Sequence, residues 1–229
     1  MSETDPIREK IIAAAATRFR HYGYPKTTIA ELACDCAMSA GNIYRFFGSK
    51  IDIAGEIARR EALHAVEKVE AVLACPHRSA RQRLEETMFA DLRYTFHLFE
   101  NQPKILELAQ IVVRERPHFH AESLWRERHV LHRILNEGRD KGEFAVPDVH
   151  RTAIALQAAT LKYRYAQLFT EQTLSELERE LAAVLSLLIR GLMPPAAQAD
   201  FTPTEIPPVI DLSEMAEIAE KPLPVSEPA

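Results

Sequence analysis

Long apolar segments and cysteines are scarce in this sequence. No run of about 18 apolar residues occurs, and the first ten residues, MSETDPIREK, are charged where a secretory signal needs an apolar stretch. The three cysteines, Cys34, Cys36 and Cys75, make an odd number without the spacing of a disulfide framework. These absences argue against a membrane-spanning chain and a disulfide-stapled secreted domain, and we expect a cytoplasmic protein.

Motifs of the common catalytic chemistries are also lacking. The sequence has no nucleophile motif, no glycine-rich phosphate loop and no spaced set of carboxylates and histidines. Four histidines do cluster, at His118, His120, His129 and His132. His129 and His132 share a helix face and could chelate a divalent ion with His118 or His120, which keeps a metal-dependent enzyme as an alternative. Surface or pocket histidines are the simpler interpretation, so we expect no enzyme, no metal and no cofactor.

Charge is unevenly distributed along the 229 residues, whose 47% hydrophobic and 27% charged content is that of a globular protein. The net charge is −5, yet residues 6–50 carry seven lysines and arginines against three acids. Residues 194–229 carry one lysine against seven acids, with eight of the 14 prolines. We therefore predict a basic N-terminal region and an acidic, disordered tail over 194–229. The tail would add solubility or fold back on the basic region.

The apolar residues between positions 6 and 193 recur at three- and four-residue spacing, and alternating β-branched runs are absent. This pattern predicts an all-α fold of about nine helices. Thr28 with Glu31 has the spacing of a capping box, and Ser39 is placed to cap the next helix. The expected helices cover about 6–22, 28–37, 39–48, 49–74, 79–100, 103–115, 117–141, 148–170 and 173–191.

Two short helices joined by a tight turn on a basic stretch are the outline of a helix-turn-helix DNA-binding unit. The second helix begins with SAGN, whose small residues allow a close approach to DNA, and Gly41 has no side chain to hold the backbone away. One turn later, the phenol of Tyr44 can touch a phosphate or a thymine methyl, and the guanidinium of Arg45 can bind guanine. Lys50 is placed for a phosphate, whereas Ile43, Phe46 and Phe47 have the spacing of a buried face.

The segment TTIAELACDCAMSAGNIYRFFGSKIDI resembles the N-terminal DNA-binding domain of the TetR family of bacterial transcriptional regulators (TetR/AcrR-like), and IIAAAATRFRHYGYPKTTI is similar to the family's first helix. The resemblance covers about residues 7–60. It implies that Thr27, Thr28 and Lys50 hold phosphates and that the start of the second short helix lies at the groove. The DNA-binding residues expected on this basis are Thr27, Thr28, Ser39, Ala40, Gly41, Asn42, Tyr44, Arg45 and Lys50.

The resemblance also implies a three-helix DNA-binding domain at 1–51 and a helical ligand-binding and dimerisation domain at 52–193, before the tail at 194–229. In the family the last two helices form a dimer's four-helix bundle, which here places the interface at about 148–191; the same faces could be intramolecular core. The ligand pocket is expected to include Phe96, Trp125, His129 and Tyr163. Trp125, His129 and Tyr163 each combine an apolar body with a polar tip, and Phe96 supplies aromatic surface.

These features predict a homodimeric repressor that binds a double-stranded, palindromic operator and is released by a small, largely apolar or aromatic ligand. The alternative is a DNA-binding protein of the same fold that is constitutive or answers a protein partner. A tightly packed second domain without a cavity would favour that alternative.

Overall fold

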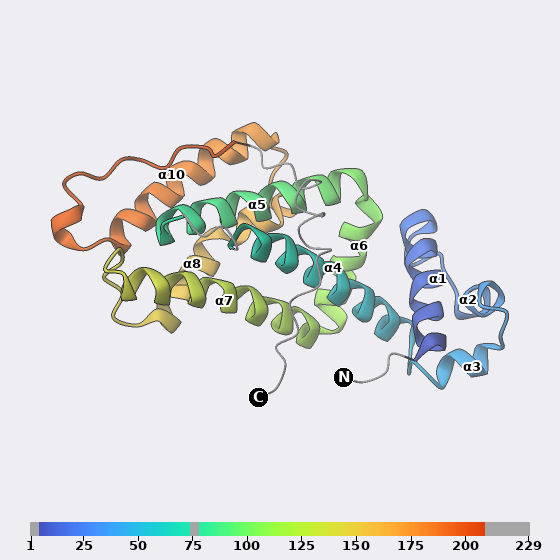
Figure 1. Ribbon diagram of the computed structural model, residues 1–229. Coiled ribbons are helices and arrows are strands. Elements are labelled where there is room, and N and C mark those ends of the chain that lie inside the picture. The colour runs from blue at the N-terminus through green and yellow to red at the C-terminus, as the bar shows by residue number, and fades with distance from the viewer. Residues whose placement is uncertain (1–4, 74–77, 209–229) are drawn as a thin grey trace, which may run out of the picture. The chain divides into compact units, whose positions relative to one another are not determined.

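A computed structural model of the protein describes residues 5–73 and 78–208, without the side chains of 68–73, 120, 123 and 169. Regular structure in these ranges is helical, with no strand, which confirms the predicted all-α fold (Figure 1). The α-helices are α1 (Pro6–Tyr22), α2 (Ile29–Asp35), α3 (Ala40–Tyr44), α4 (Lys50–Leu73), α5 (Ala80–Asn101), α6 (Pro103–Glu115), α7 (Pro117–Asp140), α8 (Val149–Arg164), α9 (Ala166–Phe169) and α10 (Leu174–Leu192). In the described part of the chain, no helix is long and apolar enough to cross a membrane.

The helices begin where side chains satisfy their first backbone N–H groups. Thr28 forms the predicted capping box with Glu31 at the start of α2, and the Ser39 side chain accepts from the Asn42 N–H at the start of α3. A second capping box joins Thr173 to Glu176 at the start of α10. These short-range contacts set the helix boundaries, which is why the sequence could predict them.

Two predicted helices are shorter in the structure. The second short helix was expected to reach residue 48, but α3 ends at Tyr44 because the next N–H groups bond at three-residue spacing, as from Phe46 to Ile43 at 3.0 Å. The single helix expected over 148–170 is two, α8 and α9, because Tyr165 leaves helical geometry with φ −128° and ψ 44°.

By their mutual contacts the residues form two compact units. The first consists of residues 1–64 and 96–127, so α6 and the first part of α7 group with the N-terminal helices. Within it α1 packs against α2 and α6, and α2 packs against α3. The fully buried side chains at its centre include Ile11, Phe19, Leu32, Ile43 and Ile53. The domain boundaries expected at 51 and 193 remain a prediction.

The second unit consists of residues 65–95 and 128–229. Its core includes Leu84, Phe89, Ile134, Leu135, Leu177, Leu181 and Leu185. Helix α5 also buries charge there: Asp91 accepts from Arg164 of α8 at 2.7 Å, and Arg93 donates to Glu178 of α10 at 2.6 Å. Paired charges of this kind tie α5 to both helices, because separating either pair would leave a buried ion without a counter-charge.

Residues 194–208 are the first part of the segment 194–229, for which the sequence predicts disorder. In the structure they follow a defined path, with a 3-10 turn at Pro195–Ala197 and a backbone N–H of Thr204 bonded to Ser186 of α10 at 2.9 Å. The expectation for residues 209–229 lies outside the described residues.

Candidate nucleic-acid interface

Helices α2 and α3 are joined by a tight turn at residues 36–39. The Met38 N–H reaches back to the Ala33 carbonyl at 2.9 Å, and Ala37 has a positive φ of 53°, which is uncommon for a residue with a side chain. Cys36 is buried behind this turn, and Ile43 of α3 is fully buried. Helix α2 is therefore fixed against α1 and α3 against α2, and α3 keeps exposed residues such as Gly41 and Tyr44 on its other side.

That solvent-facing side carries the residues expected to read DNA. Tyr44 is 53% exposed, and Arg45 and Gly41 are exposed beside it. Neither the Tyr44 hydroxyl nor the Arg45 guanidinium has a polar partner among the residues that the structure describes. At Gly41 an added Cβ would meet only Ser39 Oγ, at 3.9 Å, so packing inside the protein does not require glycine there. Small size at this position instead leaves the surface open to something outside the chain.

The three hydroxyl residues predicted for DNA contact already serve the local fold. Thr27 is 1% exposed and donates to the Gly23 carbonyl at 3.0 Å. The Thr28 hydroxyl donates to Glu31 at 2.8 Å, and the Ser39 hydroxyl accepts from Asn42 at 3.2 Å. Thr28 and Ser39 remain exposed. The Ser39 hydroxyl keeps its hydrogen for a phosphate oxygen, whereas the Thr28 hydroxyl would have to turn its hydrogen away from Glu31 to donate to one, and the Thr27 hydroxyl is buried.

Lys50 is the first residue of α4, and its ammonium is turned inward. It donates to the carbonyl oxygens of Tyr24 at 2.8 Å and Thr27 at 2.7 Å, and it lies 4.1 Å from the centre of the Tyr24 ring. Burial lowers the pKa of this ammonium, because the charged form loses hydration. Lys50 thus fixes the loop that leads into α2, a role that sequence reasoning missed because only the fold brings the two segments together.

The remaining cations of the N-terminal region divide into two groups. Arg18 pairs with Asp35 of α2, and Arg8 and Arg20 pair with Glu56 and Glu61 of α4, so these charges serve the structure. Lys10, Lys26 and Arg45 are exposed and have no ion pair among the described residues. These three are available to neutralise phosphates, and Lys10 and Lys26 were not singled out from the sequence.

A charged cluster fastens α1 to α4. Arg60 bridges Glu9 of α1, at 2.6 Å, and Glu56 of its own helix, at 3.1 Å. Burial acts to raise the pKa of Glu56, but hydrogen bonds from Arg59 and Arg60 outweigh it and hold that pKa below its ordinary value. This cluster therefore anchors α1, against which α2 packs, to α4.

The start of α4 is also tied to the junction between α6 and α7. Asp52 accepts from Ser49 at 2.6 Å and from Arg116, the residue between the two helices, at 3.1 Å. The Phe119 ring lies against Gly55 so closely that a Cβ on Gly55 would lie 2.4 Å from a ring carbon. This link connects the end of the helix-turn-helix segment to α6 and α7 within one unit.

Two family models match the chain in succession. The bacterial regulatory proteins of the tetR family match residues 11–57, which include α2, α3 and the start of α4. The tetracyclin repressor-like C-terminal domain matches residues 80–185. The chain belongs to the tetR family of bacterial regulatory proteins. Its helix-turn-helix is thus that of a family of DNA-binding transcription regulators, as the resemblance predicted.

The TetR assignment agrees with individual relatives. The HTH-type transcriptional regulator HbdR of Aromatoleum sp. (strain CIB) is 46% identical over 46 residues, a match that spans 20% of this chain and 20% of HbdR. Among solved structures, SmeT of Stenotrophomonas maltophilia, in a complex with triclosan, is 19% identical, with TM-score 0.61 over 90% of this chain and 99% of that chain. Thermus thermophilus FadR, a repressor in complex with lauroyl-CoA, is 20% identical, with TM-score 0.62 over 82% and 95%. These structures show a shared fold.

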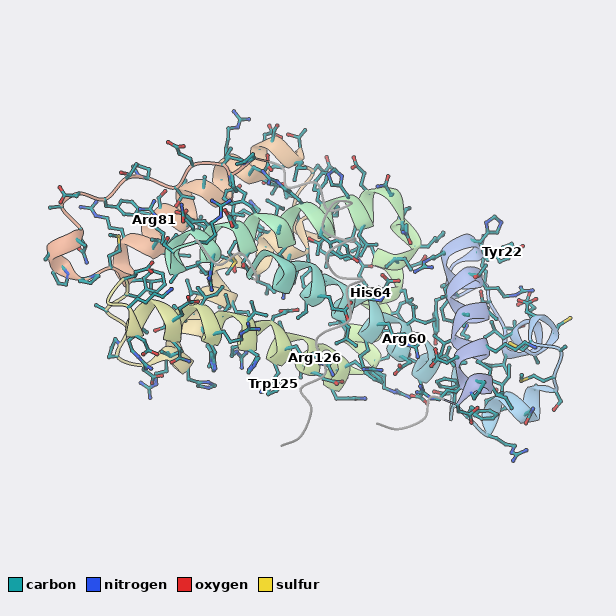
Figure 2. All side chains as sticks on the ribbon, viewed as in Figure 1. Tyr22, Arg60, His64, Arg81, Trp125 and Arg126 are labelled. Atoms are coloured by element: carbon teal, nitrogen blue, oxygen red, sulfur yellow. The ribbon has the colours of Figure 1, made fainter. Side chains whose placement is uncertain are left out.

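The four residues predicted for the TetR-type ligand pocket lie in different surroundings. In the first unit, Phe96 is half-buried and Trp125 is 63% exposed on α7 (Figure 2). In the second unit, His129 is exposed, whereas Tyr163 is 5% exposed and donates to Glu180 at 3.1 Å. Burial, and then the Glu180 carboxylate, raise the pKa of Tyr163, so its hydroxyl stays protonated.

The clustered histidines are spread over both units. His118 is exposed in the first unit, and the side chain of His120 lies outside the description. His132 stacks edge-on against His150 of α8 with ring centres 5.3 Å apart. Among the described residues, no group of three histidines, cysteines or carboxylates is arranged to hold a metal ion.

Proposed function

We propose that this TetR-family protein is a homodimeric repressor that binds a palindromic operator through α3 and the residues around it. The observation that carries the proposal is the exposure of Tyr44 and Arg45 at α3. Most other polar side chains of α1 to α3 form hydrogen bonds or ion pairs within the protein. Tyr44, Arg45 and the start of α3, from Ser39 to Asn42, would contact the groove. Thr28, Lys10 and Lys26 would contact phosphates, while Thr27 and Lys50 would contribute mainly by fixing the α2 loop.

The dimer would form through α8 and α10, in the 148–191 region. Both helices bury one face in the second unit, yet Leu187 of α10 is 76% exposed and Ile154 and Leu161 of α8 are 39% and 36% exposed. Apolar side chains on two neighbouring helices fit a self-complementary interface, which a twofold dimer requires. A dimer would also present two copies of α3, and an operator with two half-sites matches that symmetry.

A small-molecule effector would act on the second, larger domain. SmeT binds triclosan and FadR binds lauroyl-CoA. Because this protein shares their fold, these complexes support an effector with a large apolar part. His129 and Tyr163, which both belong to the second unit, remain the proposed contacts there, whereas Phe96 and Trp125 belong to the first unit. The Arg116–Asp52 pair and the Phe119–Gly55 contact give a path by which a shift of α6 and α7 would move the start of α4.

The first experiment is selection of bound duplexes from a random pool by the purified protein, across a salt series. A palindromic motif should be enriched, and Tyr44→Ala or Arg45→Ala should lower affinity for it by about tenfold or more. Tyr22→Ala is the matched control, because Tyr22 is 51% exposed on α1 and outside the proposed contacts (Figure 2). A motif that is indifferent to Tyr44 and Arg45 would contradict the proposal.

The dimer is tested separately by sedimentation of Leu187→Glu. A charge at this position should shift the protein towards monomers and weaken binding to a two-half-site duplex. Val113→Glu is the control, because Val113 is 41% exposed on α6, outside the proposed interface. An unchanged sedimentation coefficient for Leu187→Glu would argue against the α8/α10 interface.

A further inference from the structure

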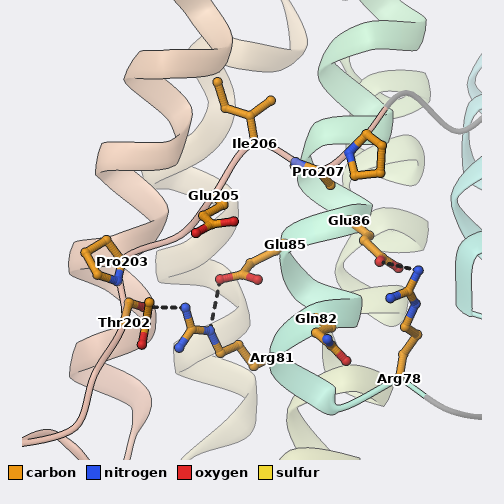
Figure 3. Close-up of a pocket in the computed structure, with 11 residues that line it drawn as sticks. Arg78, Arg81, Gln82, Glu85, Glu86, Thr202, Pro203, Glu205, Ile206 and Pro207 are labelled. Atoms are coloured by element: carbon orange, nitrogen blue, oxygen red, sulfur yellow. Dashed lines mark hydrogen bonds and ion pairs between the residues drawn. The ribbon is translucent and has the colours of Figure 1, made fainter.

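Residues 201–208, which we call the strap, lie between α5 and α10 in the second unit (Figure 3). The strap has no helix or strand of its own, and three of its eight residues are prolines. Its contacts with the two helices are consequently made by backbone groups and a few side chains. They resemble the way a protein holds an extended peptide.

Two arginines of α5 bind the strap by its backbone carbonyls. Arg81 donates to the Thr202 carbonyl near one end, and the Phe201 ring lies 4.8 Å from its guanidinium carbon. Arg93, which is 9% exposed, donates to the carbonyls of Pro207 at 2.7 Å and Pro208 at 3.2 Å near the other end. Prolines favour an extended backbone and leave their carbonyls free to accept, so the composition of the strap suits these donors.

Thr204 anchors the middle of the strap. It is 7% exposed; its N–H donates to Ser186 of α10 at 2.9 Å, and its hydroxyl donates to Glu85 of α5 at 2.8 Å. Thr202, two residues earlier, has an exposed side chain and contributes a backbone carbonyl. The chain thus offers one threonine that holds the strap and a neighbouring one that does not.

The strap is held without close apolar packing. A cavity of about 480 Å³ separates part of it from α5, lined by charged side chains such as Arg78, Glu86 and Glu205. Ile206 is 41% exposed, so part of its side chain stays in contact with solvent in the docked strap. A segment fastened by hydrogen bonds beside a cavity can detach at lower cost than one buried in a core.

We propose that the groove between α5 and α10 is a docking site for an extended, proline-containing peptide and that the strap occupies it reversibly as an intramolecular ligand. Arg81, Arg93, Glu85 and Ser186 are the recognition groups of the groove. Occupation in cis is favoured because tethering gives the strap an effective concentration on the order of millimolar. An untethered copy of the same peptide should therefore bind when the strap is weakened.

The test uses the full chain and a fluorescein-labelled synthetic peptide of residues 200–208, DFTPTEIPP, with fluorescence anisotropy as the readout. Thr204→Val removes the hydrogen bond to Glu85, so this chain should bind the peptide about tenfold more tightly than the wild type does. Thr202→Val is the matched control and should behave as the wild type. A peptide that itself carries Thr204→Val should bind the weakened chain less tightly than the wild-type peptide.

Hydrogen exchange gives a second readout, since the amides of the strap should exchange about tenfold faster in Thr204→Val and not in Thr202→Val. Phe201→Ala, which removes the ring from Arg81, is a second releasing variant and should show the same two effects. The proposal is overturned if the peptide binds all the chains equally or not at all. It is equally overturned if both releasing variants lose the helical fold, because the strap would then be a permanent structural element.

Discussion

The ammonium of Lys50 donates a hydrogen bond to the carbonyl oxygen of Thr27 at 2.7 Å. Lys50 begins α4, and Thr27 ends the loop that leads into α2, so this contact joins the two ends of the helix-turn-helix segment. A lysine that the sequence marks as a phosphate ligand is therefore also part of the scaffold that presents α2 and α3.

Replacing Lys50 by methionine should lower the free energy of unfolding by about 1–3 kcal/mol, because two carbonyls lose their charged donor. Urea unfolding measures this effect. Lys26→Met is the control: Lys26 is exposed and without an ion pair among the described residues, so stability should stay unchanged while the salt dependence of DNA binding falls by about one unit of slope. Equal unfolding midpoints for Lys50→Met and the wild type would contradict the structural role.

Gly41→Ala should separate DNA binding from stability. An added Cβ would have only Ser39 Oγ nearby, at 3.9 Å, and alanine is favoured over glycine inside a helix by about 1 kcal/mol. The variant should consequently be at least as stable as the wild type, yet bind the selected operator about tenfold more weakly, a cost of about 1.4 kcal/mol. Undiminished affinity in an electrophoretic or anisotropy titration would show that this surface does not meet DNA.

Gly55→Ala should have the opposite profile. Its Cβ would lie 2.4 Å from a Phe119 ring carbon, so thermal unfolding should show a loss of about 1–3 kcal/mol. Adding Phe119→Leu should restore part of this loss by making room for the methyl group. Gly191→Ala in α10 is the control, since an added Cβ there meets nothing within 4 Å. Failure of Phe119→Leu to rescue Gly55→Ala would place the strain elsewhere.

His132 should make the protein less stable in mild acid. Burial lowers the pKa of His132 below its ordinary value of 6.5, with smaller contributions from the charges of His150, His129 and Arg128. The native state then binds fewer protons than the unfolded chain, so stability rises with pH and is lost progressively as the pH falls below about 6.5.

The measurement is chemical unfolding of the wild type and His132→Gln between about pH 5 and pH 7.5. The variant should lose stability less steeply as the pH falls. His64→Gln, a change of an exposed histidine on α4, is the control for a histidine-to-glutamine change as such. The same slope in His132→Gln as in the wild type would exclude His132 as the titrating group.

Sequence patterns predicted the parts of this protein that depend on neighbours along the chain. The capping residues Thr28 and Ser39 and the buried Ile43 and Phe47 lie where their spacing placed them. Helix periodicity and capping act over three or four residues, so they can be recognised without a structure. The family resemblance in residues 7–60 rests on the same local pattern.

Long-range contacts could not be predicted, because nothing in the spacing shows which side chains meet across the fold. Lys50 donates to the carbonyls of Tyr24 and Thr27 rather than facing outward, and Arg116 is paired with Asp52, 64 residues away. Residues 201–208 have the composition of a disordered tail, but Arg81 and Arg93 supply donors that hold them.

The sequence by itself determined the all-helical architecture, the helix-turn-helix and the chemistry offered by Tyr44 and Arg45, since these follow from local periodicity and residue type. Only the tertiary structure decided which cations remain free and which are used within the fold, and where the strap docks. Such pairings depend on the three-dimensional positions of residues far apart in the chain, and the fold alone brings them within hydrogen-bonding distance.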